Sequence, residues 1–277
     1  MTGLVLPARD AGAAAGLARL RLLVGVEYKR IMQSRVAWLL AGLMVYTVLV
    51  IPFILTGPQE EFTRLLAGWI GHDALDGKII LFIWIDAAMN KLSIIMGAVL
   101  GGGIIADEKA RGSFDILLSK PVAAGDYFLA KWAAALLALA TFYVGGCLLA
   151  LATFPFSVAG FPAADFAVLS AIHLFAALFS AGFAAMLAAA TGNRLLAMLT
   201  SVVVVGMLVG FAFVGFYFPA IQWAMQLNPF FHGVKLIGLV GAYTAWDVLG
   251  AIAVLIGFNL VVAAIGRWRA IVLIGRG

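Results

Sequence analysis

Long apolar runs restrict the fold of this 277-residue sequence more than any other feature. Six runs of about 20 residues follow one another, and a helix of about 20 apolar residues is long enough to span a bilayer. Hydrophobic residues make up 65% of the chain and charged residues 11%, whereas soluble domains have about 45–50% and about 25%. One aqueous core cannot bury so much apolar surface, so the sequence predicts an all-α membrane protein.

The expected spans cover residues 36–56, 79–105, 127–154, 165–190, 195–218 and 246–265. Gly, Pro and Asn cluster between them, as turns require, and short re-entrant helices are expected around Pro219 and Pro229. Residues 17–35 place apolar side chains at helical spacing and basic ones mostly elsewhere, which predicts an amphipathic helix at the membrane interface. We expect one membrane domain over residues 1–277, with a tail and interfacial helix at 1–35 and a six-helix domain at 36–277.

The basic residues predict the orientation. If both termini, the loop at 106–131 and the turn at 192–194 share one side, that side holds every Lys and Arg except Arg64, Lys78, Lys91 and Lys235. By the positive-inside rule both termini are then cytoplasmic, and we expect a multi-pass protein of the inner (cytoplasmic) membrane. The same distribution assigns the net charge of +5 to the membrane surface, so no nucleic-acid partner is expected.

No motif for catalysis is present. The phosphate-binding pattern G-x-x-x-x-G-K-[ST] is missing, as are G-x-S-x-G and H-E-x-x-H. We therefore expect neither an enzyme nor a cofactor or metal site in this chain. His173 is expected to hydrogen-bond between helices, and Met89 and Met96 to fill apolar gaps rather than bind copper. The pairs Gly97/Gly101 and Gly206/Gly210 predict close helix approach, within the chain or between subunits.

The second span carries three polar residues, Asp86, Asn90 and Lys91. Residues four apart share a face of an α-helix, so Asp86 and Asn90 are expected together and Lys91 is expected to point elsewhere. One interpretation is a transport pathway or outer gate, because charges inside spans usually face protein or water. The other is an interfacial helix end with a lysine that extends its ammonium group towards water or pairs with an acid.

The loop at 106–131 interrupts the apolar pattern abruptly. Gly112 and Ser113 can turn the chain and cap a short helix. Phe114, Leu117 and Leu118 would then lie on one face, and Pro121 would end the helix. The pattern predicts a short amphipathic helix between two spans, suited to docking in the groove of a soluble partner.

The same segment resembles the signature of ABC-2 type permeases. The matching residues are Glu108-x-x-x-Gly112-Ser113, then Leu117-Leu118-x-Lys-Pro121-Val122, then Lys131. Ser113 stands where threonine is commoner, and Ala123-Ala124 replaces a hydroxyl-basic pair. Asn228-Pro229 is similar to the Asn-Pro segment before the last helix of that family.

The resemblance implies a type V exporter-like permease subunit that alternates access. Its partners would be an ATP-binding cassette subunit, which holds ATP and Mg, and a second permease copy. The residues implied in coupling are Glu108, Gly112, Ser113, Phe114, Leu117, Leu118 and Pro121, while Asn228 and Pro229 join the candidate outer gate. A non-transporting membrane scaffold and a permease for maturation of a copper enzyme are the alternatives. The absence of a deep charged cluster favours an apolar or amphipathic cargo.

Overall fold

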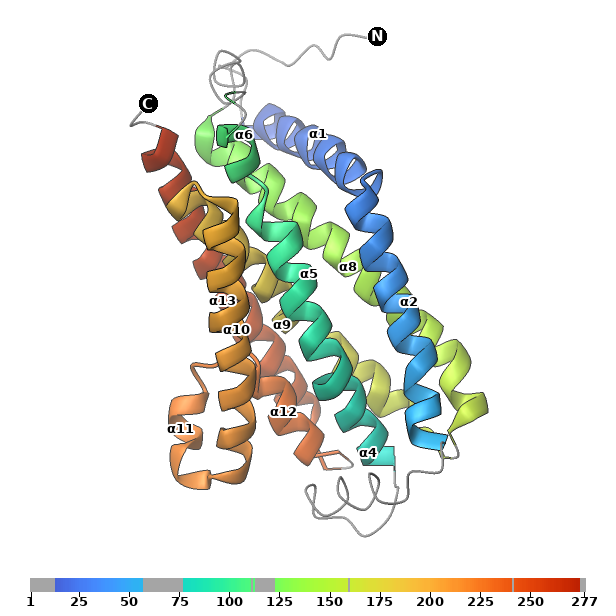
Figure 1. The fold of residues 1–277 in the computed structure, drawn as a ribbon. Coiled ribbons are helices and arrows are strands. Elements are labelled where there is room, and N and C mark those ends of the chain that lie inside the picture. The colour runs from blue at the N-terminus through green and yellow to red at the C-terminus, as the bar shows by residue number, and fades with distance from the viewer. Residues whose placement is uncertain are drawn as a thin grey trace.

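The computed structural model describes residues 13–56, 77–110, 112, 123–158, 160–240 and 242–274, and every regular element in these ranges is a helix (Figure 1). Five helical segments are long and apolar enough to cross a membrane: Ile80–Lys109, α8 (Ala124–Ser157), α9 (Ala163–Thr191), α10 (Arg194–Tyr217) and α13 (Ala245–Ile274). A bent pair, α1 (Ala13–Met32) and α2 (Arg35–Thr56), brings the number to six when it counts as one span. The predicted all-α membrane fold is therefore confirmed.

The helix expected before the first span is α1, and its axis is bent by 69° from that of α2. The bend falls at a turn around Ser34, whose hydroxyl oxygen accepts from the Ala37 backbone at 3.1 Å and so caps α2. α1 packs along α8, where the hydroxyl oxygens of Tyr28 and Thr141 lie 3.0 Å apart. In Figure 1 the start of α1, the end of α13 and α6 (Ala106–Ala110) lie at one end of the bundle, which we call the α6 end.

The second span is composite. It consists of α4 (Gly77–Phe82), the π-helix η1 (Ile83–Asn90) and α5 (Lys91–Gly102), and a turn then leads into α6. α5 lies against α9 at two glycines: a Cβ placed at Gly97 would lie 2.8 Å from a backbone nitrogen of α9, and one at Gly101 would lie 2.9 Å from another. These two glycines therefore pack within the chain, whereas a Cβ at Gly206 or Gly210 on α10 would meet nothing within 4 Å.

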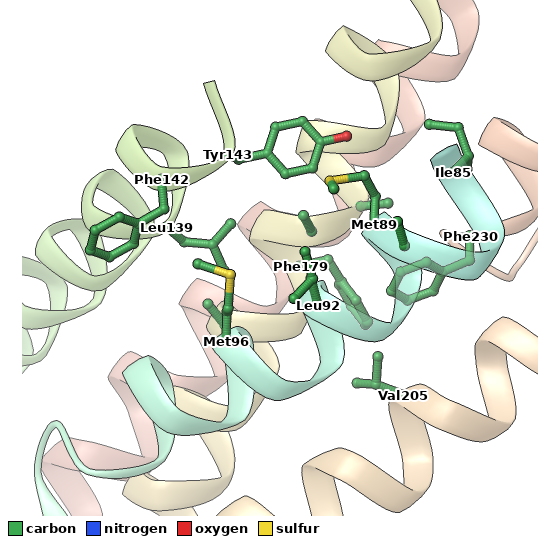
Figure 2. Close-up of a cluster of buried hydrophobic side chains, with 14 of the residues drawn as sticks. Ile85, Met89, Leu92, Met96, Leu139, Phe142, Tyr143, Phe179, Val205 and Phe230 are labelled. Carbon is green, nitrogen blue, oxygen red and sulfur yellow. The ribbon is translucent and has the colours of Figure 1, made fainter. Parts of the chain in front are cut away.

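The core between the second span, α8 and α9 is mostly apolar, with a few buried polar residues such as Asn90 and His173. Met89 and Met96 are 0% and 2% exposed and belong to the buried cluster shown in Figure 2, with Leu139 and Tyr143 of α8 and Phe179 of α9 among its members. Both methionines therefore pack in the core, as expected, since flexible thioether side chains fit irregular gaps.

The opposite end, which we call the α12 end, carries three short helices: η2 (Pro219–Ile221), α11 (Gln222–Met225) and α12 (Phe231–Gly238). They confirm the short helices expected around Pro219 and Pro229. The last span differs from expectation, because α13 continues to Ile274 instead of ending near residue 265. Contacts with neighbouring helices hold this extension: Arg269 donates to the Ala190 carbonyl at 3.1 Å, and Arg267 lies 3.6 Å from the Asp126 carboxylate.

Candidate functional site

Glu108 lies at the centre of a group of charged side chains at the α6 end. It belongs to α6, and its side chain is only 7% exposed. One carboxylate oxygen is 2.7 Å from the Lys131 ammonium and 3.2 Å from the Arg30 guanidinium, while the other accepts from the Tyr127 hydroxyl at 2.6 Å. Burial of a carboxylate is costly without such partners, so these contacts explain how the charge is held there.

Glu27 completes this group, which we call the ionic cluster (Glu27, Arg30, Glu108, Tyr127 and Lys131). Its carboxylate lies 3.0 Å from Lys131 and 3.4 Å from Arg30. The negative charges of its two acids balance the positive charges of its two cations. The Lys131 side chain is only 4% exposed. Because the members come from α1, α6 and α8, the cluster ties α6, at the start of the 106–131 loop, to α1 and α8.

The structure tests only part of the predicted coupling segment. Gly112 has a φ of 66°, in the left-handed region that glycine tolerates, as expected at a turn. The coupling roles of Glu108 and Gly112 stay predictions. The same holds for the predicted coupling residues that lie outside the described residues: Ser113, Phe114, Leu117, Leu118 and Pro121. Sequence reasoning selected Glu108 and Lys131 but missed Glu27, Arg30 and Tyr127, whose only sequence signal was their place on the amphipathic helix or beside Lys131.

The structure pairs Lys91 with Asp86, which is one of the two arrangements expected for it. Its ammonium group lies 3.3 Å from the Asp86 carboxylate and donates to the Asp86 carbonyl at 2.8 Å, while Asn90 donates to the same carboxylate at 3.4 Å. The reason is η1: π-helical bonding joins residue i to i+5, so residues five apart come over one another. Asp86 therefore contacts both Asn90, which is buried, and Lys91, which is exposed.

Asn90 also links this group to the interior. Its side-chain oxygen lies 2.8 Å from His173 Nε2, and His173 Nδ1 lies 2.9 Å from the Tyr143 hydroxyl. His173 is 2% exposed, so it joins helices by hydrogen bonds, as expected. A chain of polar side chains thus joins three spans at the residue where the π-helix ends and α5 begins.

Asn228 and Pro229 lie at the α12 end and are both buried. The Asn228 amide donates to the Leu208 carbonyl at 2.6 Å, and its oxygen accepts from the Phe230 backbone at 3.0 Å. Asn228 therefore fastens the segment before α12 to α10. The Phe230 ring lies 6.4 Å from that of His173, which places this segment beside the polar chain but not in the Asp86 group.

The second span presents one accessible line of residues, which runs from α5 through the following turn to α6, although most of this span is buried. The line follows positions four apart, and we call it the open stripe: Lys91, Ile95, Val99, Gly103 and Asp107. Lys91 and Ile95 are exposed, and the other three are partly exposed and line a cavity of about 220 Å³ at the α6 end. The stripe therefore joins an ion pair inside the span to a cavity at its end.

The family of this chain follows from comparison with known proteins. Residues 79–268 match the family described as ABC-2 family transporter protein. The chain belongs to this family. No curated protein matches the sequence. Membership in the ABC-2 family supports a permease of an ABC transporter, a subunit type that is typically not the catalytic one.

In an ABC-2 permease, the ionic cluster and the open stripe can serve different tasks. The cluster holds α6, which precedes the segment that the sequence predicts to meet an ATP-binding cassette subunit, and the stripe offers an accessible track along a span. Among the described residues, no group of three or more His, Cys, Asp or Glu side chains is placed to hold a metal ion.

Proposed function

We propose that this chain is the permease subunit of an ABC exporter of the inner membrane. A separate subunit binds ATP and Mg, docks on the 106–131 loop and drives alternating access. A second permease copy completes the pathway, and both termini and the α6 end face the cytoplasm. The positive-inside distribution of Lys and Arg supports this orientation.

The observation that carries the proposal is the ionic cluster. A motion imposed on the loop must reach the spans, and Glu108 at the start of that loop is held by Arg30 of α1 and by Lys131 and Tyr127 of α8. Separation of buried charges is costly, because each is left without its partner. A displacement of α6 would therefore move α1 and α8 with it.

The open stripe supports a pathway along α5. Lys91 lies at most about 16 Å from the Ile80 end of its span, since the α-helical rise is about 1.5 Å per residue and the wider turns of η1 advance less. Its side chain is 57% exposed there, and a charge at this depth is unfavourable against lipid. The stripe is therefore best satisfied by facing a second permease copy and an aqueous or substrate-filled path.

The proposal is tested by purification of the tagged chain with its partner from detergent extracts. An untagged ATPase subunit should accompany it, and ATP hydrolysis by the complex should fall in Phe114→Ala and Leu117→Ala. Ser119→Ala, predicted on the other face of the same segment, is the matched control. The proposal fails if no ATPase accompanies the chain, or if hydrolysis is equal in all three variants and the wild type.

A further inference from the structure

The cavity at the α6 end has walls of two kinds. Arg30, Arg194 and Asp107 contribute charged groups, while Val36, Val99 and Ile104 contribute apolar surface. Its walls come from α1, α2, the second span with α6, α8 and α10, so it opens beside the membrane-facing helices at the end of the bundle. A ligand that fills it must satisfy charge and apolar surface together.

Three acids and three cations line this cavity, and the two arginines are the most exposed of these charged residues. Arg30 and Arg194 side chains are 51% and 45% exposed. The carboxylates behind them are more deeply placed, with side-chain exposures of 14% for Glu27, 7% for Glu108 and 27% for Asp107. Lys131 is 4% exposed and lies between two carboxylates. A ligand entering the cavity therefore meets guanidinium groups first.

Both arginines retain donors for a ligand. A guanidinium has five N–H groups in a planar fork that matches phosphate and carboxylate geometry. Arg30 directs only Nη1 at Glu27 and Glu108, and Arg194 directs only Nη1 at Asp107, in the contacts found within the described residues. The remaining N–H groups of two side chains from α1 and α10 are thus available at one cavity.

The location favours an amphiphile over a free ion. Val99 and Gly103 belong both to the cavity wall and to the open stripe, so the cavity adjoins the apolar part of the stripe. Arg side chains at a membrane interface place their charge at headgroup level while their stems lie along apolar surface. A headgroup at the arginines would leave its tail beside Val99 and Val36.

We propose that this cavity binds the anionic phosphate headgroup of a lipid-like amphiphile, with Arg30 and Arg194 as its ligands and Val36 and Val99 beside its tail. The inference rests on the proposed function, in which the amphiphile enters the pathway along the open stripe. The same chemistry is present in a transported amphiphile and in a resident phospholipid of the membrane. ATP-driven movement of the bound amphiphile separates these two sources.

The first test measures binding by the purified chain in detergent, without ATP or any ATPase subunit. Phosphatidylglycerol is the anionic probe, phosphatidylcholine the zwitterionic one and inorganic phosphate the probe without a tail. Phosphatidylglycerol should bind most tightly, and Arg194→Gln should weaken it about tenfold, since a charge-assisted hydrogen bond is lost. Arg267→Gln is the matched control, because Arg267 is 49% exposed and paired with Asp126 outside the cavity.

A second variant tests the free space of the cavity while its charged residues stay unchanged. Val99→Phe places a larger side chain in the cavity and leaves both arginines in place, so it should also weaken phosphatidylglycerol binding. The proposal would be overturned if phosphatidylcholine or inorganic phosphate bound as tightly as phosphatidylglycerol. It would also be overturned if Arg267→Gln weakened phosphatidylglycerol binding as much as Arg194→Gln does. Because no ATPase is present, such a failure leaves the predicted partnership untouched.

The source of the amphiphile is decided in vesicles that contain the chain together with its ATPase. If labelled phosphatidylglycerol crosses the bilayer on addition of ATP, and Arg194→Gln slows it, the cavity is a substrate entry site. If it binds but does not cross, the cavity holds a resident phospholipid, and the entry role along the open stripe is refuted.

Discussion

Lys131→Met removes the most deeply placed cation of the ionic cluster while keeping a side chain of similar length. Lys131 lies 2.7 Å from Glu108 and 3.0 Å from Glu27 and is 4% exposed. Without it, two carboxylates share one cation, Arg30, so the cluster carries an uncompensated negative charge. Breaking a buried pair in this way destabilises a protein by about 3–5 kcal/mol, and we expect a loss of the free energy of unfolding in that range.

The double variant Glu108→Gln/Lys131→Met makes the reasoning specific. It removes one charge of each sign and leaves the Glu27–Arg30 pair, 3.4 Å apart, so the cluster is neutral again. We expect the double variant to lose about 2 kcal/mol less unfolding free energy than the two single variants lose together. Such a coupling is typical of groups in one network.

The free energy of unfolding is measured by titration with SDS in mixed micelles. Arg267→Gln is the control, since the Arg267–Asp126 pair is 3.6 Å apart with both side chains about half exposed, and such pairs contribute about 0–1 kcal/mol. If Lys131→Met costs no more than Arg267→Gln, or if the two changes in the cluster are additive, the cluster is not the coupled unit described above.

Three further outcomes are expected. Gly97→Ala should lower the unfolding free energy by about 1–3 kcal/mol through overpacking against α9. Gly206→Ala, whose Cβ would meet none of the described residues within 4 Å, should raise it by about 0.5–1 kcal/mol in the isolated chain, because glycine inside a helix is less favourable than alanine; equal thermal shifts would contradict this. Lys91→Met should slow ATP-driven transport in vesicles. Its melting temperature should change little, because an ion pair with a 57% exposed lysine contributes about 1 kcal/mol or less. Normal transport would exclude Lys91 from the pathway. Burial lowers the pKa of His232 below its ordinary 6.5, so the unfolded chain takes up the proton first and stability should fall as the pH drops below about 6.5; His232→Gln should flatten this part of the stability profile, and an unchanged profile would refute the assignment.

The spans could be predicted from the sequence because their apolar surface exceeds what a soluble core can bury. The short helices around Pro219 and Pro229 could also be predicted, because proline restricts the backbone there. Glu108 and Lys131 could be selected because they belong to a recognisable pattern of residues. Their actual contacts could not, since Arg30 approaches Glu108 only after α1 packs against α8.

Two other features depend on tertiary contacts that no local pattern encodes. The segment Ile83–Asn90 has no Pro or Gly to mark an irregularity, yet it is π-helical, and its last residue bonds His173 of another span at 2.8 Å. The two Gly-x-x-x-Gly pairs have the same spacing, but among the described residues only the one on α5 meets a neighbouring helix. Both outcomes depend on which surfaces the folded chain brings together.

The π-helix also has a consequence for how the second span combines two requirements. The glycines of α5 fix the rotation of its inner half against α9, and in an unbroken α-helix that would dictate the direction of every residue before them. The wider turns of Ile83–Asn90 shift the phase of the preceding residues, so their direction is set independently of α5. One helix thereby satisfies two unrelated angular constraints, close packing at one end and an accessible Asp86–Lys91 pair towards the other.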